Sequence, residues 1–142
     1  MTQATRLQQK LAAARQRRTL LEPVPGSDGT VRVRYVPLDI DAVERFEDHS
    51  GLGAKANLAR ACGVLADTAD RIEIRGDDGW ERISDGFTVE LARELGMLDD
   101  GVEADDIQAV DIVRKFYLDP DVIVAVYDRV RRNSKGILDP SR

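Results

Sequence analysis

The sequence predicts an α+β fold that is predominantly helical, with five to six helices and one or two small β-hairpins. Several segments carry apolar residues at helical spacing and end at glycine or proline. Two other regions alternate apolar and polar residues around glycine-containing turns, which is typical of hairpins. The length of 142 residues fits a single domain, and the presence of one cysteine excludes an internal disulfide.

The chain begins with a basic segment that predicts a helix over residues 3–18. Leu7, Leu11 and Ala14 recur at helical spacing, and neighbouring alanines favour a helix. The polar residues around them leave a narrow apolar stripe, so this helix needs a partner surface. The expected division of the chain is a basic N-terminal helix or extension over residues 1–18, a single α+β domain over 19–132 and a flexible C-terminal tail over 133–142.

Residues 19–35 predict the first hairpin. Its turn is signalled by Pro-Gly-Ser-Asp-Gly at residues 25–29. After the turn, residues 31–35 alternate valine or tyrosine with arginine, which indicates a half-exposed strand. Residues 19–24 are the expected partner strand, and Pro23 places that strand at a sheet edge because proline lacks a backbone donor.

A second hairpin is predicted over residues 71–83, where two alternating segments flank an Asp-Gly turn. In this interpretation Ile72 and Ile74 face the core. Trp80 is the only tryptophan, and we interpret it as a residue that packs within the fold in preference to one that stacks against a ligand.

Apolar periodicity predicts further helices between and after the hairpins. Asp39 or Asp41 caps a short helix that carries Val43 and Phe46. Longer helices are expected over residues 54–68, over residues 87–95 with Gly96 as the stop, and over residues 104–117.

A last helix is expected to begin with Asp119 as its cap and Pro120 at its first position. Its apolar stripe is formed by Val122, Ile123, Val126 and Val130.

The net charge of −5 conceals an uneven distribution. Residues 1–34 hold seven basic and two acidic groups, a balance of +5. Residues 35–128 hold nine basic and 23 acidic groups, a balance of −14. Residues 129–142 hold five basic groups and one acidic group, a balance of +4. The acidic body would repel a long duplex, and the sequence has no glycine–aromatic RNA-binding signature, zinc finger or convincing helix-turn-helix, so we expect no nucleic-acid partner.

The basic ends of the chain allow two interpretations. The basic helix either folds back on the acidic body or faces water, or the two ends contact a protein partner or a second copy of the chain. The candidate partner-binding residues are Arg15, Arg17, Arg18, Arg129, Arg131 and Arg132.

The sequence contains no recognisable catalytic apparatus. His49 is the only histidine, and the apolar setting of Cys62 argues for a small buried side chain instead of a Cys–His nucleophile. No nucleophile elbow, phosphate-binding loop or dinucleotide fingerprint is present in the sequence. We therefore expect a protein that is not an enzyme, without catalytic residues and without a cofactor.

Paired acidic residues are the feature closest to a cation site. The pairs lack the spacing of a calcium loop, and several have a simpler role at a turn or at a helix start. We expect no metal site from these pairs, which are Asp39/Asp41, Asp77/Asp78, Asp99/Asp100, Asp105/Asp106 and Asp119/Asp121.

The sequence indicates a cytoplasmic location. Residues 1–21 contain no apolar stretch of signal-peptide length. The longest apolar run, residues 122–127, is far too short to span a bilayer. We expect no membrane partner.

Several short motifs follow one another in a fixed order. They are Arg-Tyr-Val-Pro-Leu-Asp at 34–39, Asp-Asp-Gly at 77–79, Leu-Ala-Arg-Glu-Leu-Gly at 91–96 and Val-Arg-Lys-Phe at 113–116. This order resembles the tail assembly chaperones of long-tailed bacteriophages, in the form found in phages of high-GC hosts. The likeness covers most of residues 20–132 and leaves the basic first 18 residues unexplained.

The resemblance implies a non-enzymatic protein that coats the long helical tape-measure protein and helps to recruit tail-tube subunits around it. The family often makes a longer product by ribosomal frameshifting near the end of the gene. The implied location is the host cytoplasm. An acidic body with basic ends could also associate head to tail, so a homo-oligomer is a further expected form of the protein.

Two alternatives to the chaperone hypothesis stand beside it. The first is a structural virion protein, such as a head–tail connector or a minor capsid component, located in the virion. The second is a small enzyme or metal-binding domain that uses the acidic pairs.

Overall fold

The computed structural model describes residues 3–38, 53–98 and 101–138. In these ranges the chain forms five α-helices and a four-stranded antiparallel sheet, which confirms the predicted α+β class with two hairpins. The elements are α1 (Gln3–Gln16), β1 (Leu20–Pro23), β2 (Val31–Tyr35), α3 (Ala54–Thr68), β3 (Ala69–Gly76), β4 (Gly79–Ser84), α4 (Val89–Glu94), the 3-10 helix η1 (Ala104–Asp106), α5 (Ala109–Tyr117) and α6 (Pro120–Leu138).

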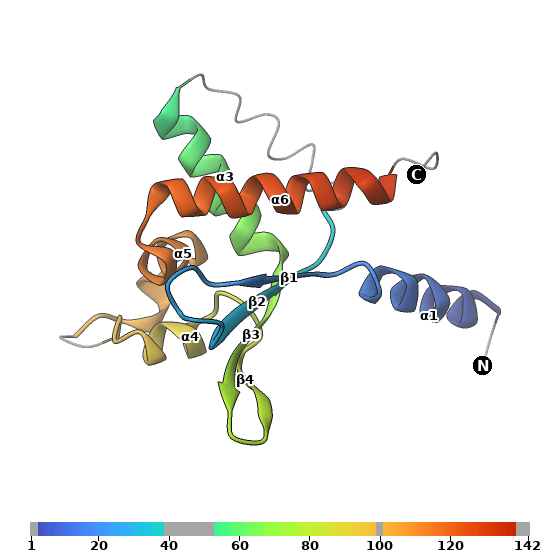
Figure 1. Cartoon of the computed structure of the whole chain (residues 1–142), viewed down its shortest axis with the longest axis horizontal. Coiled ribbons are helices and arrows are strands. Elements are labelled where there is room, and N and C mark those ends of the chain that lie inside the picture. Colours follow the sequence, from blue (N-terminus) through green and yellow to red (C-terminus); the bar gives the residue numbers. More distant parts are fainter. Residues whose placement is uncertain (1–2, 39–52, 99–100, 139–142) are drawn as a thin grey trace.

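The sheet is a simple meander in which each strand pairs with the next one in sequence (Figure 1). Val33 of β2 lies opposite Ile72 of β3, and Glu73 of β3 lies opposite Arg82 of β4. β1 is an edge strand that ends at Pro23, as the sequence predicts.

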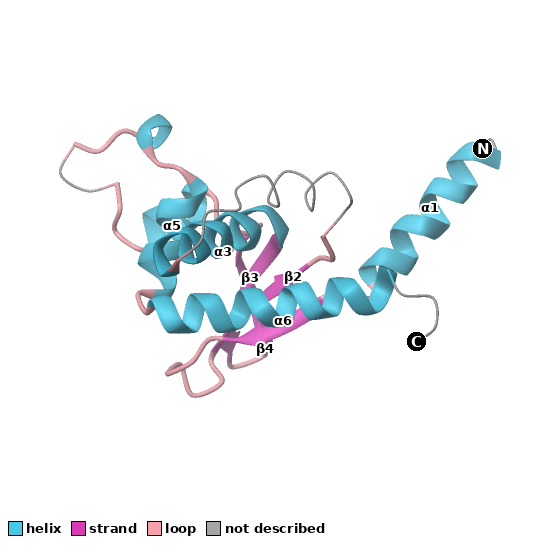
Figure 2. Cartoon of the chain, turned by 90° about the horizontal axis from the view of Figure 1, so that it is seen from above, coloured by secondary structure: helices cyan, strands magenta, loops and turns pink. Residues whose placement is uncertain are grey.

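Helices cover one face of this sheet. Figure 2 shows α3 and α6 side by side in front of the strands, and α5 packs against both helices. Val33 and Ile72 come from the sheet and are fully buried against this helical layer. The predicted apolar stripes of α3 and α6 are confirmed, because the core includes Ala61, Cys62, Leu65, Ile123, Val126 and Val130.

The prediction that Ile74 faces the core is wrong, because its side chain is 39% exposed. Ile74 pairs with Val31 toward the turn of the β3–β4 hairpin, which extends beyond the helices (Figure 1). Trp80 also lies outside the core cluster. It packs instead under the guanidinium of Arg32, whose central carbon is 3.9 Å from the centroid of the ring.

The single helix predicted over residues 104–117 is divided into η1 and α5. Ile107, between them, has extended backbone angles. Gln108 then caps a new helix by a capping box, in which its backbone N–H donates to the Asp111 carboxylate at 3.3 Å. The helix predicted over residues 87–95 begins later, at Val89, and Gly96 follows it with a left-handed φ of +73°.

The last helix begins as predicted, because the backbone N–H of Asp121 donates to the Asp119 side chain at 2.9 Å. It continues to Leu138, so the predicted start of a flexible tail at residue 133 is wrong. The buried hydroxyl of Ser134 donates to the Val130 carbonyl and accepts from the backbone N–H of Leu38, both at 2.9 Å. These bonds attach the end of α6 to the domain. Residues 139–142, the predicted helix after Asp39 and His49 lie outside the described residues.

Candidate functional site

Helix α1 projects away from the rest of the domain (Figures 1 and 2). Leu7 and Leu11 of its apolar stripe are 59% and 61% exposed. An Arg15 guanidinium N–H donates to the carbonyl oxygen of Pro37, which fixes the last turn of the helix to the body. The sequence allowed the basic helix either to fold back on the acidic body or to face water. The structure shows a helix that faces water.

The two basic ends of the sequence meet in space. The side-chain amide of Asn133 on α6 donates to the carbonyl oxygen of Arg18 at 3.0 Å. Arg17 and Arg18 are both exposed in the turn that follows α1. Within the described part of the chain, Arg15, Arg17 and Arg18 form no ion pair, so their charge stays available to a partner.

The three candidate arginines of α6 are already paired within the chain. Arg129 donates through Nε to the carboxylate of Glu22, whose side chain is only 9% exposed. Arg131 and Arg132 both bind the carboxylate of Asp128, at 3.1 and 2.8 Å. Arg129 therefore stabilises the buried Glu22. In this it differs from the exposed arginines that follow α1.

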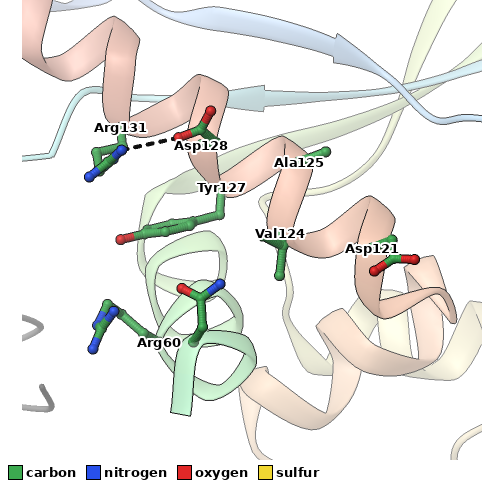
Figure 3. Close-up of a pocket in the computed structure, with 8 residues that line it drawn as sticks. Arg60, Asp121, Val124, Ala125, Tyr127, Asp128 and Arg131 are labelled. Atoms are coloured by element: carbon green, nitrogen blue, oxygen red, sulfur yellow. Dashed lines mark hydrogen bonds and ion pairs between the residues drawn. The ribbon is translucent and has the colours of Figure 1, made fainter. Parts of the chain in front are cut away.

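A shallow pocket of about 430 Å³ lies between α3 and α6 (Figure 3). Tyr127 extends from α6 toward α3, and the ion pair of Asp128 with Arg131 lies at its rim. The lining mixes charges of both signs with few apolar groups, so it defines no ligand chemistry. Its residues are Asn57, Arg60, Asp121, Val124, Ala125, Tyr127, Asp128 and Arg131.

A second basic surface was not predicted. It lies on the face of the sheet opposite the core, where the outward positions of β2 and β3 are Arg32, Arg34, Arg71, Glu73 and Arg75. Glu73 accepts from Nε of Arg32 at 2.8 Å and from Nε of Arg71 at 3.0 Å. The arginines of residues 32, 34, 71 and 75 could have been assigned to one outward face from their alternation alone. We call Arg32, Arg71, Glu73, Arg75 and Trp80 the outer-face cluster.

The described residues contain no group of three or more His, Cys, Asp and Glu side chains that could hold a metal ion. Cys62 is buried, as predicted. Burial raises the pKa of its thiol, and the opposing hydrogen bond from Arg114 is the smaller effect. A buried thiol with a raised pKa is a poor nucleophile.

In the described ranges, no helix combines the length and the apolar character needed to cross a bilayer. Comparison of the chain with protein-family models, curated proteins and solved structures finds no match.

Proposed function

We propose that the chain is a non-enzymatic bacteriophage tail assembly chaperone, which binds the tape-measure protein and recruits tail-tube subunits in the host cytoplasm. The sequence resemblance supplies the identity of these partners. The observation that carries the binding role is α1, whose leucines have no partner within the described chain.

Helix α1 has the properties of one half of a helix–helix contact. Leu7 and Leu11 are four residues apart and therefore lie on the same face, one turn apart. Full burial of each leucine contributes about 1.5–3 kcal/mol. Two leucines give a contact of moderate strength, which suits an assembly factor that must later be released. A long helical protein offers many equivalent apolar faces to such a helix.

The charge of α1 indicates which kind of partner helix it prefers. Arg6 and Lys10 precede the two leucines in sequence, and the described part of α1 has no acidic residue. Basic residues beside an apolar stripe favour a partner helix with acidic residues at the corresponding positions. The acidic body of the chain itself would discourage binding along a polyanion.

Co-expression with the tape-measure and tail-tube proteins of the same phage tests the proposal. We expect the chain to co-purify with one of them and the double substitution Leu7→Ala/Leu11→Ala to weaken the complex at least tenfold. Leu118→Ala is the control, because Leu118 is 74% exposed and precedes the first residue of α6, whereas Asn133, near the other end of α6, contacts the turn that follows α1. If the wild-type chain associates with neither protein, the proposal is wrong.

Mass spectrometry of purified virions tests the same proposal from another side. A chaperone leaves the particle, so we expect the chain to be missing from mature virions. Stoichiometric presence there would contradict the chaperone role and favour a head–tail connector or a minor capsid component.

A further inference from the structure

The outer-face cluster places two arginines, Arg32 and Arg71, on one carboxylate. Arg32 and Arg71 each use Nε to bind Glu73, so neither bond needs the terminal guanidinium nitrogens. The Glu73 side chain is 9% exposed, whereas those of Arg32 and Arg71 are 27% and 36% exposed. One carboxylate thus orients two partly exposed guanidinium groups and neutralises only one of their two positive charges.

Two further residues extend this arrangement across the sheet. Arg75 is exposed on β3 and forms no ion pair with any described residue. It lies opposite Trp80 of β4, and the ring of Trp80 supports the guanidinium of Arg32 at 3.9 Å. A cation–π contact of this kind holds the guanidinium over the face of the ring. The side chains of Arg32 and Arg71 are therefore oriented before any ligand binds, which lowers the entropic cost of binding.

The nearby Arg34 differs from these arginines in its surplus charge. Asp70 accepts two bonds from it, from Nε at 2.8 Å and from a terminal nitrogen at 3.1 Å. That pair is bidentate and neutral, so it adds no attraction for an anion. The surplus charge of the face lies with Arg32, Arg71 and Arg75.

From this geometry we infer that the outer-face cluster binds a short acidic segment of a partner protein. Guanidinium groups match carboxylates in a bidentate way. Arg71 and Arg75 lie four residues apart on one strand, a span of roughly 13 Å that a few acidic side chains can cover. Trp80 provides an apolar contact beside the charges.

The charge of the whole chain favours a short peptide over nucleic acid. Residues 35–128 carry a balance of −14, which repels a long polyanion outside the cluster. A short segment interacts with the cluster within roughly one Debye length, about 8 Å at physiological salt, and avoids most of that repulsion. Such binding is independent of which partner α1 contacts.

Trp80 makes the inference directly measurable, because it is the only tryptophan of the chain. Titration of the full chain with an octaglutamate peptide should change the Trp80 emission in a saturable way. The apparent affinity should fall steeply as salt increases. The net charge of the chain is −5, so general electrostatics opposes this peptide and only a local site can bind it.

Substitution of Arg75 tests the site without removing a structural ion pair. We expect Arg75→Gln to weaken octaglutamate binding at least threefold. Arg75→Lys keeps the charge but loses the bidentate guanidinium, so it should weaken binding less. Arg93→Gln is the matched control, because Arg93 is exposed on α4 and the change in charge is the same. Circular dichroism of each variant verifies that the fold is intact.

Four results would overturn the inference. One is an unchanged Trp80 emission at every salt concentration. Another is an equal loss of affinity in Arg75→Gln and Arg93→Gln. The third is an octathymidylate that binds more tightly than octaglutamate and loses affinity in Arg75→Gln, since the site would then belong to nucleic acid. Inorganic phosphate, as a further probe, should bind more weakly than the peptide, and tighter phosphate binding would likewise contradict a peptide site.

Discussion

The hydroxyl groups of Tyr35 and Tyr117 lie 2.6 Å apart in the core, although 82 residues separate them in the chain. Tyr35 has no exposed surface and Tyr117 is 8% exposed. Their hydrogen bond joins β2 to α5, so it links the sheet to the helical layer. Phe87 and Phe116 pack beside Tyr117 and keep water away from it, with ring centroids at 6.3 and 4.9 Å.

Removal of one of the two hydroxyl groups should be costly, because the other is then buried without a partner. We expect Tyr35→Phe and Tyr117→Phe each to lower the free energy of unfolding by about 1–3 kcal/mol. The double substitution should cost clearly less than the sum of the two, since it leaves no unpaired hydroxyl. Urea denaturation of the four proteins gives this double-mutant cycle, and additive losses would contradict the coupling.

Alkaline pH should destabilise the protein through the same pair. Burial raises the pKa of Tyr35 well above its ordinary value of 10, and burial raises the pKa of Tyr117 as well. Above about pH 10 the unfolded chain loses protons that the folded chain still holds, so the free energy of unfolding falls as pH rises. Below that pH the contribution is fully present. Urea denaturation between pH 8 and pH 11 should show this fall, and it should be shallower in the double phenylalanine variant.

Gly86 lies where the chain turns from β4 into α4, with a φ of +108°. A Cβ atom at this position would overlap the carbonyl oxygen of Ala69. Gly79 has nearly the same φ, +117°, but no heavy atom lies within 4 Å of the corresponding Cβ position. We expect Gly86→Ala to destabilise the protein by about 2 kcal/mol more than Gly79→Ala, because only the first adds a steric clash to the cost of the positive φ. Equal losses in thermal denaturation would show that the close approach to Ala69 is unimportant.

Cys62 should react slowly with thiol reagents in the folded protein. Its side chain is 1% exposed, and burial raises the pKa of the thiol. Labelling therefore requires a transient opening of the core. A large-to-small substitution in the same core, Leu65→Ala, should lower stability by about 2–5 kcal/mol and accelerate labelling. Fast labelling of the wild-type chain under native conditions would contradict the buried position.

Local sequence patterns predicted the elements whose boundaries are local. Helix α3 covers Ala54–Thr68, the residues that the apolar periodicity indicated. The cap at Asp119 and the edge position of Pro23 also followed from the chemistry of single residues. In each case the signal and the structure lie within a few residues of each other.

The errors arise where a distant segment decides the outcome. Strand alternation assigns Ile72 and Ile74 to one face, but only the extent of the helical layer determines that Ile74 is exposed. The last part of α6 is attached to the domain by the bond from Leu38 to Ser134, which joins residues 96 positions apart. Periodicity within α6 contains no information about that bond.

The candidate site was predicted only in part, because some of its features also depend on distant segments of the chain. The narrow apolar stripe of α1 predicted a helix that needs a partner surface, but it left open whether the chain's own body supplies that surface; the structure shows Leu7 and Leu11 exposed. The outer-face cluster depends on the register that places Arg32 beside Glu73, and a single strand does not reveal its register. Likewise, charge alone could not show that Arg129 binds Glu22, while Arg17 and Arg18 form no ion pair with any described residue.

The contacts between the N-terminal third and α6 have a consequence for synthesis of the chain on the ribosome. The four strands are complete once Ser84 has been added, but Glu22 and Leu38 find their partners only on α6. Until then only the helices that precede α6 can cover the apolar face of the sheet, and the nascent chain presents the part that α6 will cover to other proteins. A product that terminates before Val130 would keep this face open permanently, and it would aggregate or be degraded.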